Sequence, residues 1–233
     1  MTGRSFFIAL FLLVVASSAF GQDRPIPPGV PIKEVPLAEK PESVPDGVAG
    51  RTYTNPELGF RITFPDEWLI PGDDFEDYLK SQGIDIGLKA PESIGRIDQI
   101  QLERALERVR VLVTAYRAVP GSADNAIVRV AAEDLSTVPQ VKDAVDYVDL
   151  MRSQFAVAKL PPDLKYSETQ AEQLGRNQFA FIDTENNAGK KRMYVTVRRG
   201  VALLFTLSYS KPADLITFRK IMSEADFGIK PEM

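Results

Sequence analysis

The stretch YTNPELGFRITFPDEW, residues 53–68, decides how the folded part of this chain begins. Apolar and polar residues alternate over 60–64, which is the period-2 pattern of a strand with one buried face. Pro65 cannot continue a ladder of backbone hydrogen bonds, and Trp68, the only Trp, is large enough to cover the end of a sheet. A stacking site for a ligand on Tyr53 and Trp68 is the alternative. The stretch favours architecture over a reactive site.

The residues just before this strand predict a turn. Asn55 precedes Pro56, a pair that initiates turns. Gly59 has no Cβ, so it allows the chain to turn sharply into the strand.

Farther along, the hydrophobic periodicity predicts further strands and helices. They are a capped helix at 74–82, a charged helical stretch at 97–107, a hairpin of VRVLVTAYR and AIVRVAAE, a helix at 139–158, strands at 176–183, 191–198 and 201–209, and a last helix capped by Ser210. The strand VALLFTLSY at 201–209 is apolar on both faces, so we expect it in the middle of the sheet. This order of elements predicts an α+β domain with a mostly antiparallel sheet and helices packed on it.

The first fifty residues predict export. Residues 1–21 contain Arg4, a short apolar run and small residues before Gly21, which together are typical of a signal peptide cleaved between Gly21 and Gln22. Residues 22–50 then carry a series of prolines that excludes regular structure and predicts an extended spacer: Pro25, Pro27, Pro28, Pro31, Pro36, Pro41 and Pro45. We therefore expect an exported protein, periplasmic or secreted, without a membrane span after cleavage.

The composition excludes several kinds of chemistry. The chain has no His and no Cys, which removes Ser-His and Cys-His nucleophile systems and the ordinary zinc and copper sites. Its net charge is −4 with both signs interspersed, so nothing indicates nucleic acid as a partner. Carboxylate, Lys or Tyr chemistry and oxygen-ligated cations remain.

Three groups of acidic residues are candidate sites. Asp73, Asp74, Glu76 and Asp77 do not have the spacing of an EF-hand loop, and helix capping accounts for them. The pairs Glu133–Asp134 and Glu224–Asp226 have no feature that places them in a cleft. We therefore predict no metal site, no cofactor and no catalytic residue.

The opening stretch resembles the motif Y-x-N-x-x-x-G-F-x-(I/F)-x-x-P-x-x-W with which the domain of the PsbP-like family begins, a family named for an extrinsic protein of photosystem II. NAIVRVAAEDLS and RMYVTVRRGVALLFTLSYS resemble later parts of the same family. The resemblance implies one PsbP-like domain over 51–229, built as an α/β/α sandwich around a central antiparallel sheet. The chain looks most similar to uncharacterised exported bacterial members. Metal sites of the photosynthetic members depend partly on His, so none is carried over.

One strand presents a candidate binding surface. If Met193, Val195 and Val197 face the core, the alternate residues form a row on the opposite face: Arg192, Tyr194, Thr196 and Arg198. Tyr and Arg are common anchors in interfaces, so this row predicts contact with an acidic protein partner or a carboxylated ligand. The alternatives are a solvated face or one covered by carboxylates.

These observations predict an exported, soluble, non-enzymatic protein-interaction module with an unknown protein partner. The alternative is a small-molecule or lipid carrier of the bacterial envelope, with an apolar cavity between the sheet and the helix at 139–158.

Overall fold

The computed structural model describes residues 47–71, 108–119, 122, 124–157, 160–187 and 189–229. The strands are β1 (Gly47–Ala49), β2 (Thr52–Asn55), β3 (Phe60–Thr63), β4 (Val109–Tyr116), β5 (Ile127–Asp134), β6 (Lys165–Tyr166), β7 (Gln170–Leu174), β8 (Asn177–Asn186), β9 (Gly189–Arg198) and β10 (Val201–Tyr209). The helices are α4 (Ala144–Val157) and α5 (Pro212–Glu224). The predicted signal peptide with its cleavage site, the acidic group beginning at Asp73, and the helices predicted at 74–82 and 97–107 lie outside the described residues.

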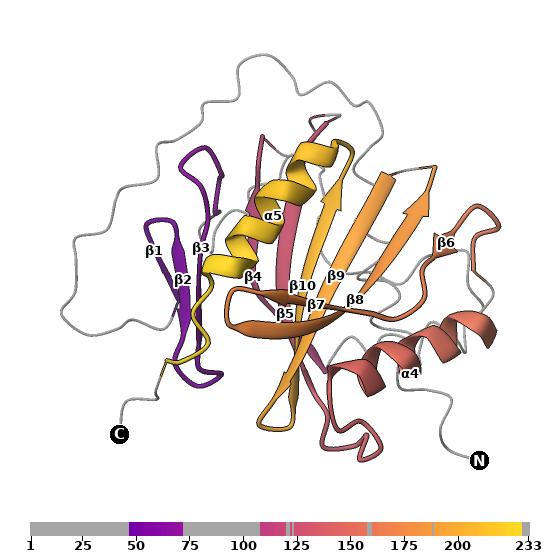
Figure 1. Ribbon diagram of the computed structural model, residues 1–233. Helices are drawn as coiled ribbons and strands as arrows, with labels where there is room; N and C mark the ends of the chain where they lie inside the picture. Colours follow the sequence, from indigo (N-terminus) through magenta and orange to yellow (C-terminus); the bar gives the residue numbers. More distant parts are fainter. Residues whose placement is uncertain are drawn as a thin grey trace.

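An antiparallel sheet of seven strands forms the larger part of the fold (Figure 1). Its strand order is β4-β5-β10-β9-β8-β6, and β7 also pairs with β8. The hairpin predicted from VRVLVTAYR and AIVRVAAE is confirmed as β4 and β5. The prediction that VALLFTLSY lies centrally is also confirmed, because β10 is bonded to β5 on one side and to β9 on the other.

The opening stretch forms a second, smaller sheet. Strands β1, β2 and β3 pair antiparallel in that order, and β1 lies inside the range predicted as a spacer. Two isolated bridges tie this part to the rest of the molecule: Arg61 with Asp226, and Leu69 with Tyr116 of β4. Figure 1 shows the small sheet standing beside α5 and the larger sheet.

The turn before β3 is built as the sequence predicts. The side-chain oxygen of Asn55 accepts the backbone N–H of Leu58 at 2.8 Å, and the N–H of Gly59 bonds to the carbonyl of Asn55 at 2.9 Å. Gly59 has a φ of 71°, which disfavours any residue with a Cβ.

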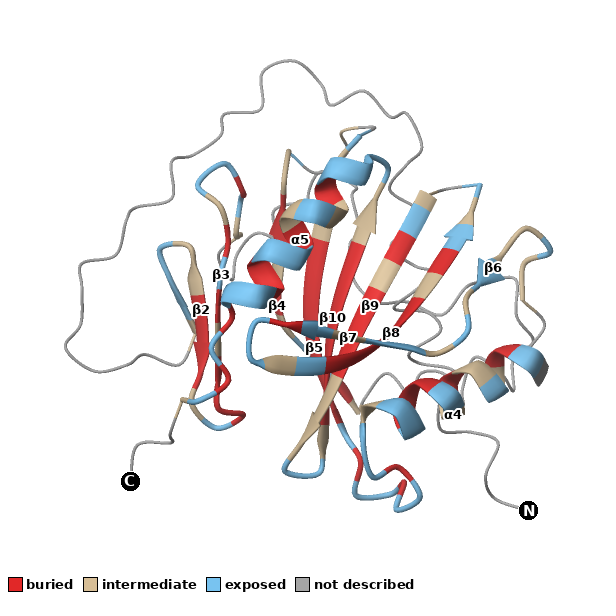
Figure 2. Cartoon of the chain, viewed as in Figure 1, coloured by how far each residue is buried: buried red, intermediate tan, exposed pale blue. Residues whose placement is uncertain are grey.

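Buried apolar side chains form two clusters, one on each face of the larger sheet. Figure 2 shows buried residues along the middle strands of that sheet. Leu203 and Phe205 of β10 belong to the cluster that includes Phe218 of α5 and the small sheet. Leu204 belongs to the other cluster, with Met151 of α4. Strand side chains alternate between faces, so the two helices pack against different clusters. The predicted α+β class with mostly antiparallel sheets is confirmed.

Both described helices begin differently from the prediction. The helix predicted at 139–158 begins at Ala144, because the carboxylate of Asp143 accepts the N–H groups of Val145 and Asp146 and caps the helix there. The last helix was predicted to be capped by Ser210, and this is wrong: its N-cap is Lys211, with no side-chain cap bond. Pro212 fixes that start by its ring geometry.

Candidate functional site

The four residues of the predicted row on β9 lie on the face that carries the α5 cluster. Tyr194 is fully buried there, and its ring lies 5.4–5.8 Å from the rings of three neighbours, Phe179, Phe181 and Phe218. Thr196 is half-buried. β7 and α5 cover the sheet at Tyr194, so this member of the row does not face solvent.

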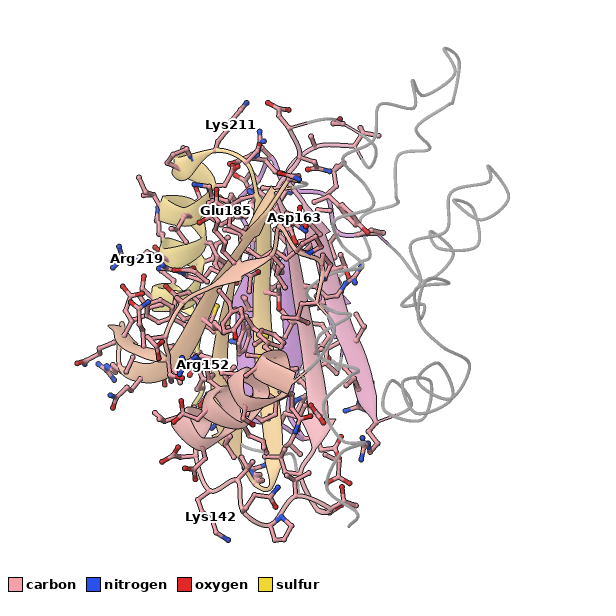
Figure 3. The ribbon with its side chains drawn as sticks, turned by 90° about the vertical axis from the view of Figure 1, so that its right-hand side faces the viewer. Lys142, Arg152, Asp163, Glu185, Lys211 and Arg219 are labelled. Atoms are coloured by element: carbon pink, nitrogen blue, oxygen red, sulfur yellow. The ribbon has the colours of Figure 1, made fainter. Side chains whose placement is uncertain are left out.

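Arg192 anchors a group of charged side chains at one corner of the molecule. Its guanidinium donates two hydrogen bonds to Asp183 on β8, at 2.7 and 2.6 Å, which is a bidentate pair. Glu172 of β7 lies 3.8 Å from Arg192 and accepts the hydroxyl of Tyr194 at 2.5 Å. Arg219 of α5, labelled in Figure 3, completes the group by bonding to Glu172. We call Arg192, Asp183, Glu172 and Arg219 the charged corner.

The charged corner also affects Tyr194. Burial, followed by the hydrogen bond to Glu172, raises the pKa of the Tyr194 hydroxyl to about 12. The phenol therefore stays protonated at neutral pH and acts as a fixed donor to Glu172. Its proton is not available for acid–base chemistry near pH 7.

Arg198, at the other end of the row, joins distant parts of the chain. Its guanidinium donates to the carbonyl of Phe227 at 2.6 Å and to that of Gly59 at 3.3 Å, and it lies over the Phe227 ring. The neighbouring Arg199 donates to the carbonyl of Glu57 at 2.5 Å. These two arginines hold the turn of the small sheet and the C-terminal segment against the β9–β10 end of the larger sheet.

The structure thus brings the four predicted residues onto one face and gives them different environments. Arg192, Thr196 and Arg198 are half-buried, and Arg192 belongs to the charged corner. Binding of a protein partner by this row stays a prediction.

One member of the acidic pair Glu133–Asp134 is buried on the α4 face. Glu133 of β5 is 1% exposed and accepts the hydroxyl of Tyr147 at 2.5 Å. Burial raises the pKa of Glu133 to about 7, against the opposing effects of the Tyr147 bond and the Arg108 charge. Burial, together with the charge of Glu133, raises the pKa of Tyr147. Glu133 can therefore gain or lose a proton near neutral pH.

The Glu133–Asp134 pair does not act as a unit, because adjacent strand residues point to opposite faces. Asp134 is exposed and accepts both the N–H and the hydroxyl of Ser136, at 2.8 and 2.9 Å. These bonds lower the pKa of Asp134. The sequence carries a signal for the burial of Glu133, because three apolar residues, Val130 to Ala132, precede it in the strand.

A shallow pocket of about 360 Å³ opens where the β9–β10 turn meets the segment that leads into α4. Its lining includes apolar side chains, among them Val138, Val141 and Val197, and polar ones such as Lys142. The carrier hypothesis predicted a closed cavity beside the helix at 139–158; this pocket lies at the start of that range and is open.

Neither helix in the described ranges is long and apolar enough to cross a membrane. Within the same ranges, no three acidic side chains are grouped so as to hold a metal ion.

Comparison with known proteins gives similarity only at the level of structure. No family model matches the chain, and no curated protein matches it. Among solved structures, cyanobacterial PsbP from Synechocystis sp. PCC 6803 is 13% identical, with a TM-score of 0.43, over 82% of this chain and 98% of that protein.

Two other solved structures are also similar. A protein from Bacteroides thetaiotaomicron VPI-5482 is 9% identical, with a TM-score of 0.39, over 76% of this chain and 48% of its own length. A Pseudomonas aeruginosa protein of unknown function, PA94, described as a putative regulator, is 18% identical, with a TM-score of 0.34, over 50% of this chain and 80% of its own. Likeness at this level assigns no function to the chain.

Proposed function

We propose that this chain is an exported, non-enzymatic protein-interaction module, built as an α/β/α sandwich of the PsbP-like kind. The leader over 1–21 and the Pro-rich segment over 22–50 support export. The absence of His and Cys from the sequence supports a role other than the common kinds of catalysis.

The observation that carries the interaction proposal is the charged corner. Its inner members, Arg192 and Glu172, are each 15% exposed, whereas the Arg219 side chain is 51% exposed and that of Asp183 is 34% exposed. The inner bonds hold the outer groups in place before any partner arrives. Binding then costs less side-chain entropy than it would for free arginine and aspartate side chains.

Crosslinking in the source organism, followed by mass spectrometry, tests the interaction. We expect Arg219→Glu to remove the crosslinked partners, because losing an anchoring Arg weakens an interface by about 2 kcal/mol, or roughly 30-fold. The matched control is Lys220→Glu, the same charge reversal at the next position of α5, where the side chain is 73% exposed and only faces Glu224. Equal loss of crosslinks in both variants, or in neither, would exclude the charged corner as the contact surface.

Export is tested separately. Residues 1–50 fused to alkaline phosphatase should give an active enzyme, because that enzyme gains activity only after it leaves the bacterial cytoplasm. An inactive fusion that accumulates in the cytoplasm would contradict export while leaving the interaction proposal open.

A second function, small-molecule binding, is favoured by the pocket beside Pro139. Volumes of several hundred cubic ångströms are usual for ligand sites. Native mass spectrometry of the purified protein should then show a retained ligand, and Pro139→Trp should displace it by filling the mouth of the pocket. Gln140→Trp is the control, because Gln140 is also exposed but does not line the pocket. If the unaltered protein shows only the mass of the polypeptide, with no ligand bound, this second function is contradicted.

A further inference from the structure

The outer edge of strand β7 has backbone groups without a partner strand. β7 pairs with β8 on one side, and no other strand of the described residues pairs with it. A two-residue turn, Gly175–Arg176, joins β7 to β8, so the closing pair Leu174 and Asn177 exchanges both of its backbone hydrogen bonds. Hydrogen-bonded positions alternate along an antiparallel pair, which turns the N–H and C=O groups of Ala171 and Gln173 outward. Both residues are exposed, and neither takes part in a backbone hydrogen bond between separate described segments.

β7 lacks the features that protect most edge strands from further pairing. Proteins usually protect an edge with Lys, Pro or a β-bulge. β4, the strand at the opposite edge, has a register shift between Val111 and Val113. β7 has the sequence QAEQL, without Lys or Pro, and its register with β8 contains no shift. Its one charged residue, Glu172, is held by Arg219 on the α5 side. The edge is therefore regular and open to a further strand.

Helix α5 runs alongside β7. Arg219 bonds to Glu172, and farther along the helix the carbonyl of Ser223 lies against Gly175, so the helix and the strand run in the same direction. Figure 1 shows the β7–β8 turn close to the C-terminal end of α5. Ile216 lies one turn before Arg219 and therefore shares its side of the helix. Ile216 is 70% exposed and the Arg219 side chain is 51% exposed, so both are available to a strand lying beside β7.

The exposed charges beside this edge favour an acidic segment. Arg176 in the β7–β8 turn is exposed, and it has no ion pair within the part of the chain that the structure describes. Arg219 shares its charge with Glu172, whose side chain is only 15% exposed. Glu168, the acid that precedes β7, bonds to Arg152 of α4. A segment with carboxylates therefore meets exposed cations along β7, whereas a basic segment would be repelled.

We propose that an extended, acidic segment of a partner protein adds to the outer edge of β7 as a further strand. Backbone hydrogen bonds to Ala171 and Gln173 hold the segment, and its side chains on the α5 side set the specificity. A carboxylate fits against Arg219 and an apolar side chain against Ile216, two residues apart because alternate residues of a strand share a face. This inference rests on the proposed interaction function and names the kind of segment that the charged corner takes.

A designed peptide tests the edge by fluorescence anisotropy. Fluorescein-labelled Thr-Glu-Thr-Val-Thr-Glu-Thr-amide places Glu, Val and Glu on one face and strand-favouring Thr on the other. We expect saturable binding to the unaltered protein, and binding weaker by about tenfold or more when Lys replaces both Glu residues. Absence of saturable binding by the acidic peptide, or equal binding by the basic one, would overturn the proposal.

Methylation of single peptide nitrogens tests whether the backbone of the peptide is bound. Adjacent residues of a strand direct their N–H groups to opposite sides, so either Val or the Thr after it faces β7. One of the two singly N-methylated peptides should bind about tenfold more weakly, and the other should bind as the parent peptide does. Equal binding by the two would contradict strand addition and indicate contact through side chains alone.

Gln173→Pro makes the same test on the protein. Proline removes an outward N–H and leaves the bonds to β8 in place, so the variant should fold and should lose about tenfold in peptide affinity. Asp66→Pro is the matched control, because Asp66 is exposed and follows Pro65 in a turn closed by the Trp68 N–H, at the position that proline favours. Circular dichroism checks that both variants fold, and if Gln173→Pro does not, the N-methylated peptides decide. Equal peptide binding by two folded variants would contradict the proposed edge.

Crosslinking in the source organism separates this inference from the proposed function. If Arg219→Glu loses the crosslinked partners and Gln173→Pro keeps them, the charged corner binds a partner but β7 does not receive a strand. If both variants keep the partners, the charged corner is not the contact surface and strand addition fails with it. Loss in both variants, together with binding of the acidic peptide, supports the added strand.

Discussion

At the scale of single residues, Gly175 leaves the least room for a Cβ among the glycines that the structure describes. It lies in the two-residue turn between β7 and β8 with a φ of 59°. A Cβ placed there would overlap the backbone carbonyl of Ser223 in the last turn of α5. The turn and the helix therefore touch through their backbones, and neither can move aside as a side chain would.

We expect Gly175→Ala to lower the free energy of unfolding by more than 3 kcal/mol, adding a backbone clash to the cost of about 1–2 kcal/mol for a left-handed alanine. Gly200→Ala is the control, because Gly200 also lies in a two-residue turn, at a φ of 76°, with nothing near its Cβ position. Urea unfolding measures both. If both variants lose the same free energy of unfolding, then the contact between Gly175 and α5 does not limit which residue this turn accepts.

Glu133 gives a pH dependence whose sign can be worked out. Its pKa is about 7 in the folded protein and about 4.5 when unfolded, so the folded state binds more protons between these values. Its contribution to stability is complete below pH 4.5 and is lost as pH rises through 7. Since 1 pKa unit is about 1.4 kcal/mol, the loss is on the order of 3 kcal/mol.

Glu133→Gln should abolish this contribution, because glutamine stays neutral and its carbonyl still accepts the Tyr147 hydroxyl. We expect the variant to gain stability over the unaltered protein as the pH rises from 5 to 8, measured by urea unfolding at each pH. Asp134→Asn is the control: the folded pKa of Asp134 is lowered, so its contribution falls with decreasing pH instead. A constant difference between Glu133→Gln and the unaltered protein would contradict the raised pKa.

At the scale of elements, strand β9 shows what periodicity can and cannot predict. The alternation correctly separates Met193 and Val195 from Arg192 and Arg198. Alternation says which side chains share a face, and charge suggests that such a face is exposed. What covers the face depends on β7 and α5, which lie elsewhere in the sequence, and this information is absent from the strand itself.

The double variant Arg192→Glu with Arg198→Glu distinguishes a surface role from a structural one. Arg192→Glu brings three carboxylates together, because the new side chain lies beside those of Asp183 and Glu172. Arg198→Glu leaves the carbonyls of Gly59 and Phe227 without their donor. Breaking a partly buried charge pair costs several kcal/mol. We expect the melting temperature to fall by roughly 10 °C or more.

Lys220→Glu with Lys190→Glu reverses the same number of charges at exposed positions and should change the melting temperature by no more than about 2 °C. If the double arginine variant is as stable as this control, then Arg192 and Arg198 lie on an ordinary solvated face and have no structural role.

Helix starts were predicted less well than strands for a related reason. Pro139 and the apolar spacing after it are compatible with a helix from that point, and only the bonds made by Asp143 set the start at Ala144. Several residues near a helix start can act as a cap, and the tertiary position of the preceding segment selects one.

At the scale of the whole molecule, the sequence predicted the α+β class and the core of the larger sheet but not the division into two sheets. Phe60 and Ile62 are fully buried as their alternation predicts. Alternation does not identify the partner strand, and β1 and β2 are short and follow a Pro-rich segment. The pocket depends on contacts between distant residues, so the sequence alone did not indicate it.

The small sheet joins the rest of the fold through a group of aromatic rings. Phe227, after α5, lies with its ring 6.0 Å from that of Phe60 on β3, 5.8 Å from that of Phe205 on β10 and 5.6 Å from that of Phe179 on β8. It is therefore in contact with both sheets at once. The only Trp in the chain, Trp68, follows β3 and reports on the small sheet by its fluorescence.

Phe227→Ala should separate the unfolding of the two sheets. In the unaltered protein we expect Trp68 fluorescence and far-ultraviolet circular dichroism to change at the same urea concentration, as one cooperative unit does. Removing the Phe227 ring costs about 3–5 kcal/mol of packing, and that loss falls on the contact between the sheets. The fluorescence transition should then move to lower urea than the dichroism transition. Ile216→Ala is the control, since Ile216 is 70% exposed and its loss should move neither transition. Coincident transitions in Phe227→Ala, both shifted together, would show that the small sheet depends on contacts other than this ring.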